Sequence, residues 1–80
     1  MSDRRTYRSP TGELAHLSHD RVAGPDRRPW WEIRLIRADG SVAPVAGQMP
    51  IVMYRTREAA RKDYHERLAA LRGDGWVRVQ

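Results

Sequence analysis

The segment Pro29–Arg37, Pro-Trp-Trp-Glu-Ile-Arg-Leu-Ile-Arg, constrains the fold more than any other part of the chain. In a β-strand, successive side chains point to opposite faces. One face then takes the apolar side chains Trp31, Ile33 and Leu35. The other face takes Trp30, Glu32, Arg34 and Ile36. Because Trp and Arg dominate recognition surfaces, the segment predicts a strand with one core face and one binding face.

The chain of 80 residues contains no Cys. This length predicts a single domain over residues 1–80 with one small core, which apolar packing alone must hold together. The sequence lacks an apolar run long enough for a membrane span, and the N-terminus lacks the apolar region of a signal peptide. We therefore expect a soluble, cytoplasmic protein without membrane contact or cofactor.

Residues 1–29 form a polar N-terminal segment. Ser9-Pro10-Thr11-Gly12 has the residue order of a type I turn, and short strands around residues 5–8 and 13–18 could flank it. Their apolar content is low, which is compatible with partial disorder. If ordered, the segment could instead fold over the binding face.

Two patterns follow the Pro29–Arg37 strand. Asp39-Gly40 predicts a hairpin turn, with a return strand at residues 41–43 that Pro44 weakens. Ile51–Tyr54 is apolar at every position, which is typical of a central strand covered on both sides.

A helix is predicted from Arg57 to Arg72. Thr56 is a favourable N-cap, and Gly73 suits the left-handed position that ends a helix. One apolar stripe recurs along this helix, at Ala60, Tyr64, Leu68 and Leu71. A short final strand then places Val77 and Val79 on the core face, with Trp76 and Arg78 on the other face.

These elements predict an α+β fold, in which a small antiparallel or mixed sheet of three to five strands packs one helix, about residues 57–72, on one face. A helix of about 24 Å covers only one face of such a sheet. The uncovered face is the predicted partner-binding site, formed by Trp30, Arg34, Ile36, Trp76 and Arg78. In the alternative interpretation, Trp30 and Trp76 complete a core beneath the N-terminal segment.

The net charge is +5, and 14 of the 15 basic residues are Arg. Because the charge is spread evenly along the chain, it favours a nucleic-acid partner only modestly. One flank of the predicted helix carries Arg57, Arg61, His65 and Arg72. Such a flank is more often solvated and salt-bridged to neighbouring acids, here Glu58, Asp63 and Glu66, than a phosphate-binding stripe.

The sequence favours neither a metal site nor catalysis. His16, His19 and Asp20 lie close together in sequence, but zinc sites need three or four defined ligands. There is no nucleophile elbow, Gly-rich phosphate loop or carboxylate pair in an apolar setting. We therefore expect a protein that is not an enzyme.

Residues 53–60, together with Tyr64, Leu68, Leu71 and Gly75-Trp76, form a strand, a capped helix and a Gly-Trp strand. Over residues 30–80 this pattern resembles small phage and mobile-element proteins, among them several anti-CRISPR proteins. The resemblance implies a non-catalytic inhibitor that occludes a nucleoprotein effector. DNA-mimicking inhibitors are acidic, so this basic chain would act through Arg and aromatic contacts.

Three functions follow from these patterns. The first is a small monomeric inhibitor or adaptor that docks on a larger protein or nucleoprotein complex through the uncovered face. The second is a nucleic-acid-binding accessory protein for single-stranded DNA or RNA, which uses the same face and Arg55, Arg57 and Arg61. The third is a structural module that forms a homodimer by burying that face against a second copy.

Overall fold

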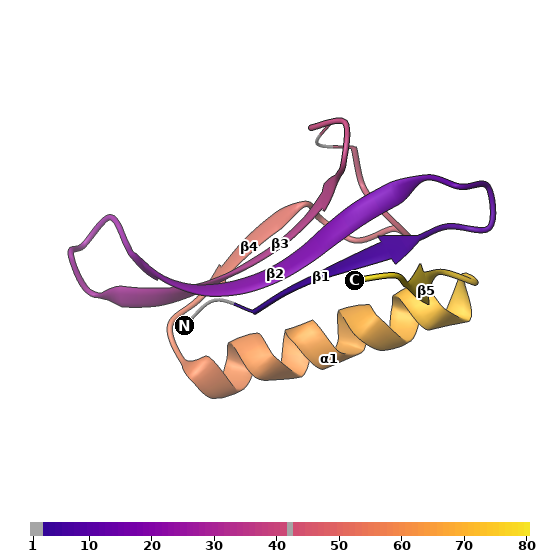
Figure 1. Ribbon diagram of the computed structural model, residues 1–80. Coiled ribbons are helices and arrows are strands. Elements are labelled where there is room, and N and C mark those ends of the chain that lie inside the picture. Colours follow the sequence, from indigo (N-terminus) through magenta and orange to yellow (C-terminus); the bar gives the residue numbers. More distant parts are fainter. Residues whose placement is uncertain (1–2, 42) are drawn as a thin grey trace.

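The computed structural model describes residues 3–41 and 43–80 and forms one sheet with one helix packed on it (Figure 1). The strands are β1 (Asp3–Arg8), β2 (Leu14–Ala23), β3 (Pro29–Arg37), β4 (Ile51–Tyr54) and β5 (Val77–Arg78), and the helix is α1 (Arg57–Gly73). The five strands have the order β4-β3-β2-β1-β5, and every neighbouring pair is antiparallel. The α+β prediction is confirmed. In the described part of the chain, no helix is long and apolar enough to cross a bilayer.

The core lies between α1 and one face of the sheet. The register of β2 and β3 sets Leu17 opposite Leu35 and His19 opposite Ile33, so these side chains share the helix-facing side. Ile33 and Leu35 are fully buried, and the predicted helical stripe packs on them. The buried apolar residues are Tyr7, Ala15, Leu17, Ile33, Leu35, Val45, Ala60, Tyr64, Leu68, Leu71 and Trp76.

Helix α1 begins as predicted but ends differently. The Thr56 hydroxyl accepts a hydrogen bond from the Ala59 amide at 3.2 Å, which confirms the N-cap. The sequence predicts an end at Arg72 with Gly73 in the left-handed position, yet Gly73 belongs to the helix, and the C-cap is Asp74. Gly75 takes the left-handed conformation, with φ of 83°. This turn lets the Trp76 amide donate to the Leu71 carbonyl at 2.9 Å, and it directs the chain back onto the sheet.

The predicted facing of the last strand is wrong. Strand β5 pairs with β1 so that Arg78 lies opposite Tyr7 and Val77 lies opposite Arg8. Because Tyr7 points toward the helix, Val77 and Val79 take the opposite side, where they are 52% and 45% exposed. Trp76, which the sequence predicts on the uncovered face, is only 8% exposed and belongs to the core.

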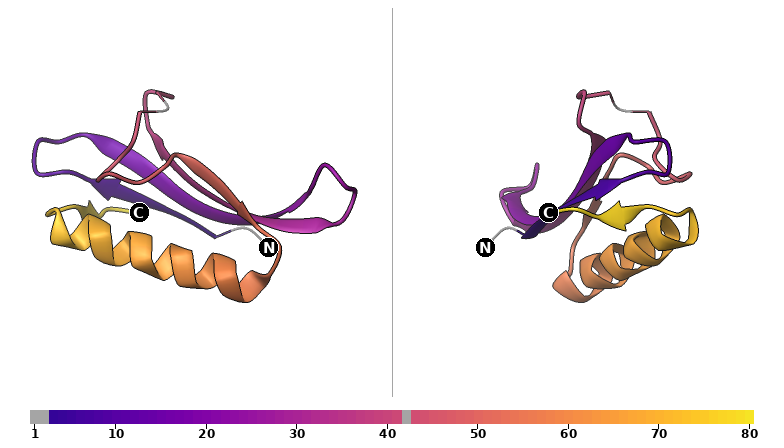
Figure 2. Two further views of the ribbon diagram at one scale, coloured as in Figure 1. Left: turned by 180° about the vertical axis from the view of Figure 1, so that it is seen from behind. Right: turned by 45° about the vertical axis from the view of Figure 1, so that its right-hand side comes forward.

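The N-terminal segment builds the sheet instead of folding over it. Residues 3–8 and 14–23 form β1 and β2, and β2 is the central strand. These strands extend beyond the short ones that the sequence predicts. In all views α1 lies on one side of the sheet, and no other described helix or strand covers the opposite side (Figures 1 and 2). We call this opposite side the uncovered face.

Strand β4 is not the doubly covered central strand that its composition predicts. It lies at the edge of the sheet, with Ile51 42% and Met53 39% exposed on the uncovered face.

The predicted return strand at residues 41–43 is also wrong for residues 41 and 43, the two that the structure describes. A turn at Gly40 leads into a loop, and Val42 lies outside the described residues. The strand that pairs with β3 on this side is β4 itself.

A buried arginine fixes this loop to the helix. Arg67 is 2% exposed, and its Nε donates to Asp63 Oδ2 at 3.1 Å. Its Nη1 donates to the Met49 carbonyl at 2.6 Å. The guanidinium therefore joins helix α1 to the segment that leads into β4.

Candidate functional site

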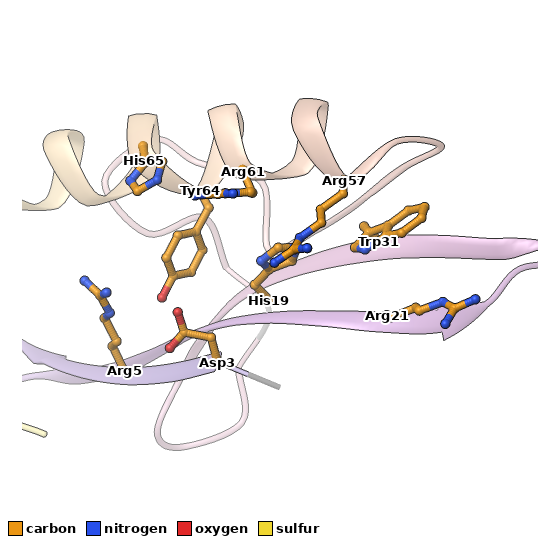
Figure 3. Close-up of a pocket in the computed structure, with 9 residues that line it drawn as sticks. All are labelled: Asp3, Arg5, His19, Arg21, Trp31, Arg57, Arg61, Tyr64 and His65. Atoms are coloured by element: carbon orange, nitrogen blue, oxygen red, sulfur yellow. The ribbon is translucent and has the colours of Figure 1, made fainter. Parts of the chain in front are cut away.

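A groove of about 780 Å³ lies beside α1 on the helix side of the sheet (Figure 3). Helix α1 contributes Arg57, Arg61 and His65, which recur every fourth residue and so lie on one flank. The strands contribute side chains from alternating positions that face the helix. The lining residues are Asp3, Arg5, His19, Arg21, Trp31, Arg57, Arg61, Tyr64 and His65. We call this site the basic groove.

The charge of the basic groove is not neutralised. Four Arg against one Asp among the lining residues give a formal charge of +3. The ion pairs found within residues 3–41 and 43–80 are Glu32–Arg34, Glu13–Arg37, Asp26–Arg55 and Asp63–Arg67. None of them uses an Arg of the groove. Arg57 and Arg61 are therefore exposed, as a solvated flank predicts, but the predicted salt bridges to neighbouring acids are not found for them within the described residues.

Aromatic side chains form the wall beneath these cations. The Tyr64 ring lies 5.8 Å from the His19 ring, and the Arg5 guanidinium lies 5.7 Å from the Tyr64 ring centroid. Tyr64 points from the helix toward Asp3, and Trp31 lies beside Arg57 (Figure 3). Arg and aromatic groups in one groove can bind phosphate and stack on a planar ring at the same time.

Three polar atoms at the groove are buried without a hydrogen-bond partner in the described chain. They are Arg5 Nε, His19 Nε2 and Tyr64 Oη. Buried polar groups in native proteins are nearly always paired. Half of the six unpaired buried side-chain atoms in the described residues thus belong to residues that line the groove.

Burial shifts the pKa values of Tyr64 and His19 in opposite directions. Burial, and then the Asp3 carboxylate, raises the pKa of Tyr64 to about 12, so its hydroxyl keeps its proton to a higher pH than an ordinary tyrosine does. Burial, and then the Arg57 guanidinium, lowers the pKa of His19 below its ordinary value. Its imidazole is therefore neutral at neutral pH.

Two histidines are expected to make stability depend on pH. Burial, and then Arg4, lowers the pKa of His16, as burial and Arg57 do for His19. The unfolded chain therefore takes up protons before the folded one does. The free energy of unfolding should be highest above pH 7 and fall as the pH drops below about 6.5, the pKa of an unfolded histidine. Urea unfolding followed by circular dichroism at several pH values measures this.

The double variant His16→Gln/His19→Gln is the control for this pH dependence. Its unfolding free energy should stay nearly constant between about pH 7.5 and 5. Asp26 and Asp39, whose pKa values are lowered by hydrogen bonds, lose their contribution only in more acidic solution. An unchanged slope in the double variant would show that other groups cause the effect.

The structure brings together only part of the predicted partner-binding site. Trp30, Arg34 and Ile36 alternate along β3 on the uncovered face. Trp76 lies in the core and cannot contribute. Arg78 is exposed, but its register places it on the helix side of the far edge, opposite Tyr7.

Trp30 is held by a local cluster at the end of the β2–β3 hairpin. Its Nε1 donates to Asp26 Oδ1 at 3.0 Å, and the Arg55 guanidinium lies 4.6 Å from the Trp30 ring. Arg55 also pairs with Asp26 at 2.7 Å. Arg55 is thus separated from the basic groove, although the sequence groups it with Arg57 and Arg61 as a nucleic-acid contact.

Sequence reasoning finds Arg57 and Arg61 but misses the strand residues of the groove. Arg5 and Arg21 lie two residues from the helix-facing Tyr7 and His19, so strand alternation carries a signal for them. The sequence predicts Trp31 in the core alone, whereas in the structure it also lines the groove. His16 and His19 lie three apart on β2 and point to opposite faces. In the described part of the chain, no group of three or more potential ligands forms a metal site.

Comparison of the chain with protein-family models, curated proteins and solved structures finds no match. The resemblance to small phage and mobile-element proteins therefore stays a prediction, and the functional argument depends on the geometry of the chain itself.

Proposed function

We infer that the chain is a non-catalytic binding protein that takes single-stranded nucleic acid in the basic groove. The observation that carries this proposal is the set of four Arg side chains without a carboxylate partner in the described chain, gathered around aromatic side chains. Phosphate contacts from Arg supply most of the affinity for nucleic acid. Aromatic side chains supply stacking that every base can use.

Each group of the groove has a separate task in this proposal. Arg57 and Arg61, on successive turns of α1, pair with phosphates of the strand. The face of Trp31 stacks on a base, which is worth about 1–3 kcal/mol. The Tyr64 ring, 5.7 Å from the Arg5 guanidinium, supports this cation in the wall of the groove through a cation–π contact.

Titration with fluorescently labelled oligonucleotides tests the proposal. Single-stranded DNA, single-stranded RNA and a duplex of the same length are each titrated separately with the protein, at about 50 and about 200 mM salt. We expect saturable binding of the single strands and a marked loss of affinity at the higher salt. Binding without salt dependence, or no binding at low salt, would contradict the proposal.

The exposed apolar residues of the uncovered face favour a second candidate, an inhibitor or adaptor of a larger macromolecular complex. Trp30, Arg34 and Ile36 would be its contacts, without Trp76. As in the class of proteins that the sequence resembles, the chain would then act in the cytoplasm as a phage or mobile-element accessory protein. This candidate requires a monomer whose uncovered face is free to bind the complex.

A further inference from the structure

We propose that the uncovered face binds a second copy of the same chain, in a symmetric face-to-face dimer. Two neighbouring rows of cross-strand partners lie in the middle of this face. The first row is Ser18, Arg34 and Ile51, on β2, β3 and β4. The second row is Asp20, Glu32 and Met53, on the same strands. On each strand, the residue of the first row and the residue of the second row are two positions apart.

The two rows are complementary under a twofold rotation. Symmetric dimers use the same patch twice, so a residue of one row meets the other row of the partner. The axis lies between the two facing sheets, at right angles to the strands and midway between the two rows. Rotation about it places each strand over the same strand of the partner copy, and each row over the other row. Arg34 then faces Glu32 of the partner copy, and Ile51 faces Met53 of the partner copy. Every such contact occurs twice.

The same rotation matches the residues farther from the axis. Trp30 lies two positions beyond Glu32 on β3, and Ile36 lies two positions beyond Arg34. The rotation therefore sets Trp30 over Ile36 of the partner copy. Arg34 is free to make the new pair, because its contact with Glu32 of its own chain is 3.7 Å long and its side chain is 48% exposed.

The apolar surface of the chain is concentrated on this face. Of the six large apolar residues that are exposed in the described chain, five lie on it, namely Leu14, Ile51, Met53, Val77 and Val79. Two of them, Ile51 and Met53, belong to the two rows, and the other three lie toward the far end of the face. The strand spacings give the face an area of roughly 500 Å² per copy. Two copies would bury roughly 1,000 Å², which is the lower limit of a specific interface.

The charges of the face select a second copy over other occupants. Arg4 and Arg34 lie beside Asp20 and Glu32 on the same surface. The two carboxylates would repel a phosphate backbone, and an acidic partner would match only the Arg row. A second copy supplies both signs in the required places.

A dimer of this kind changes what the basic groove can do. In each copy the groove lies on the helix side of the sheet, and the interface lies on the other side. The two grooves therefore open away from each other, and the dimer would hold two nucleic-acid segments at once. This consequence depends on the proposed function, whereas the dimer itself does not.

A charge-reversal series tests the dimer with the whole chain. Sedimentation equilibrium from about 1 to 100 μM should give twice the monomer mass of 9.3 kDa for the wild type. Arg34→Glu and Glu32→Arg each set like charges against each other and should weaken the dimer at least about tenfold. The double variant Arg34→Glu/Glu32→Arg should restore it, because the exchanged charges are again complementary.

Arg72→Glu on the exposed end of α1 is the matched control and should leave the dimer unchanged. Circular dichroism confirms that each variant is folded. A wild-type chain that stays a monomer throughout, which the adaptor function requires, would overturn the dimer. A dimer that survives both single reversals would overturn this interface. The monomeric variants should still bind one oligonucleotide, so a loss of the dimer is distinguishable from a failure of the groove.

Discussion

Replacement of Trp76 by Ala is expected to destabilise the chain by about 3–5 kcal/mol, the usual cost of deleting a buried Trp. The side chain is only 8% exposed and belongs to the single apolar core of the described chain. Native proteins have a total stability of about 5–15 kcal/mol, so this loss would remove a large fraction of it. Urea unfolding followed by far-ultraviolet circular dichroism measures the change.

The matched control for this substitution is Trp30→Ala. The Trp30 indole is partly exposed and makes a cation–π contact with Arg55 and a hydrogen bond to Asp26. We expect its loss to cost about 1–2 kcal/mol, because both contacts lie at the surface. An equal loss of stability in the two variants would contradict the different environments that the structure gives these indoles.

The elements that local periodicity specifies could be predicted from the sequence. Ala60, Tyr64, Leu68 and Leu71 share a helical stripe whatever they pack on, and Thr56 forms its cap with the helix alone. The inward side chains of β3 follow from the alternation of one strand. These features need no knowledge of the other strands, and all of them are confirmed.

The features that depend on pairing could not be predicted. Strand β5 has only two residues, and its facing is fixed by the position of Arg78 opposite Tyr7 in β1. The composition of Ile51–Tyr54 indicates burial but not whether the strand lies at an edge or in the middle. The basic groove has the same origin, since three strands and the helix each contribute to it. Residues far apart in sequence, such as Arg5 and Arg61, meet only once the strand order is known.

The double variant Arg57→Ala/Arg61→Ala is expected to weaken the binding of single-stranded nucleic acid by about 100-fold. Each charged hydrogen bond to phosphate is worth at least about 1.5 kcal/mol, and 1.4 kcal/mol is a factor of ten in affinity. Both side chains line the groove without an ion pair in the described chain. The slope of log affinity against log salt should also fall by about 1.4, or 0.7 for each lost phosphate contact.

Lys62→Ala/Arg72→Ala is the matched control, because it removes the same charge from exposed positions of the same helix outside the groove. Ala is favourable in a helix, so neither pair of substitutions should unfold α1. If net charge alone attracts the nucleic acid, both double variants should lose the same affinity. If the nucleic acid is bound in the groove, only Arg57→Ala/Arg61→Ala should lose affinity. Equal losses of affinity would therefore exclude the groove as the binding site and leave only the general basic charge of the chain as the cause.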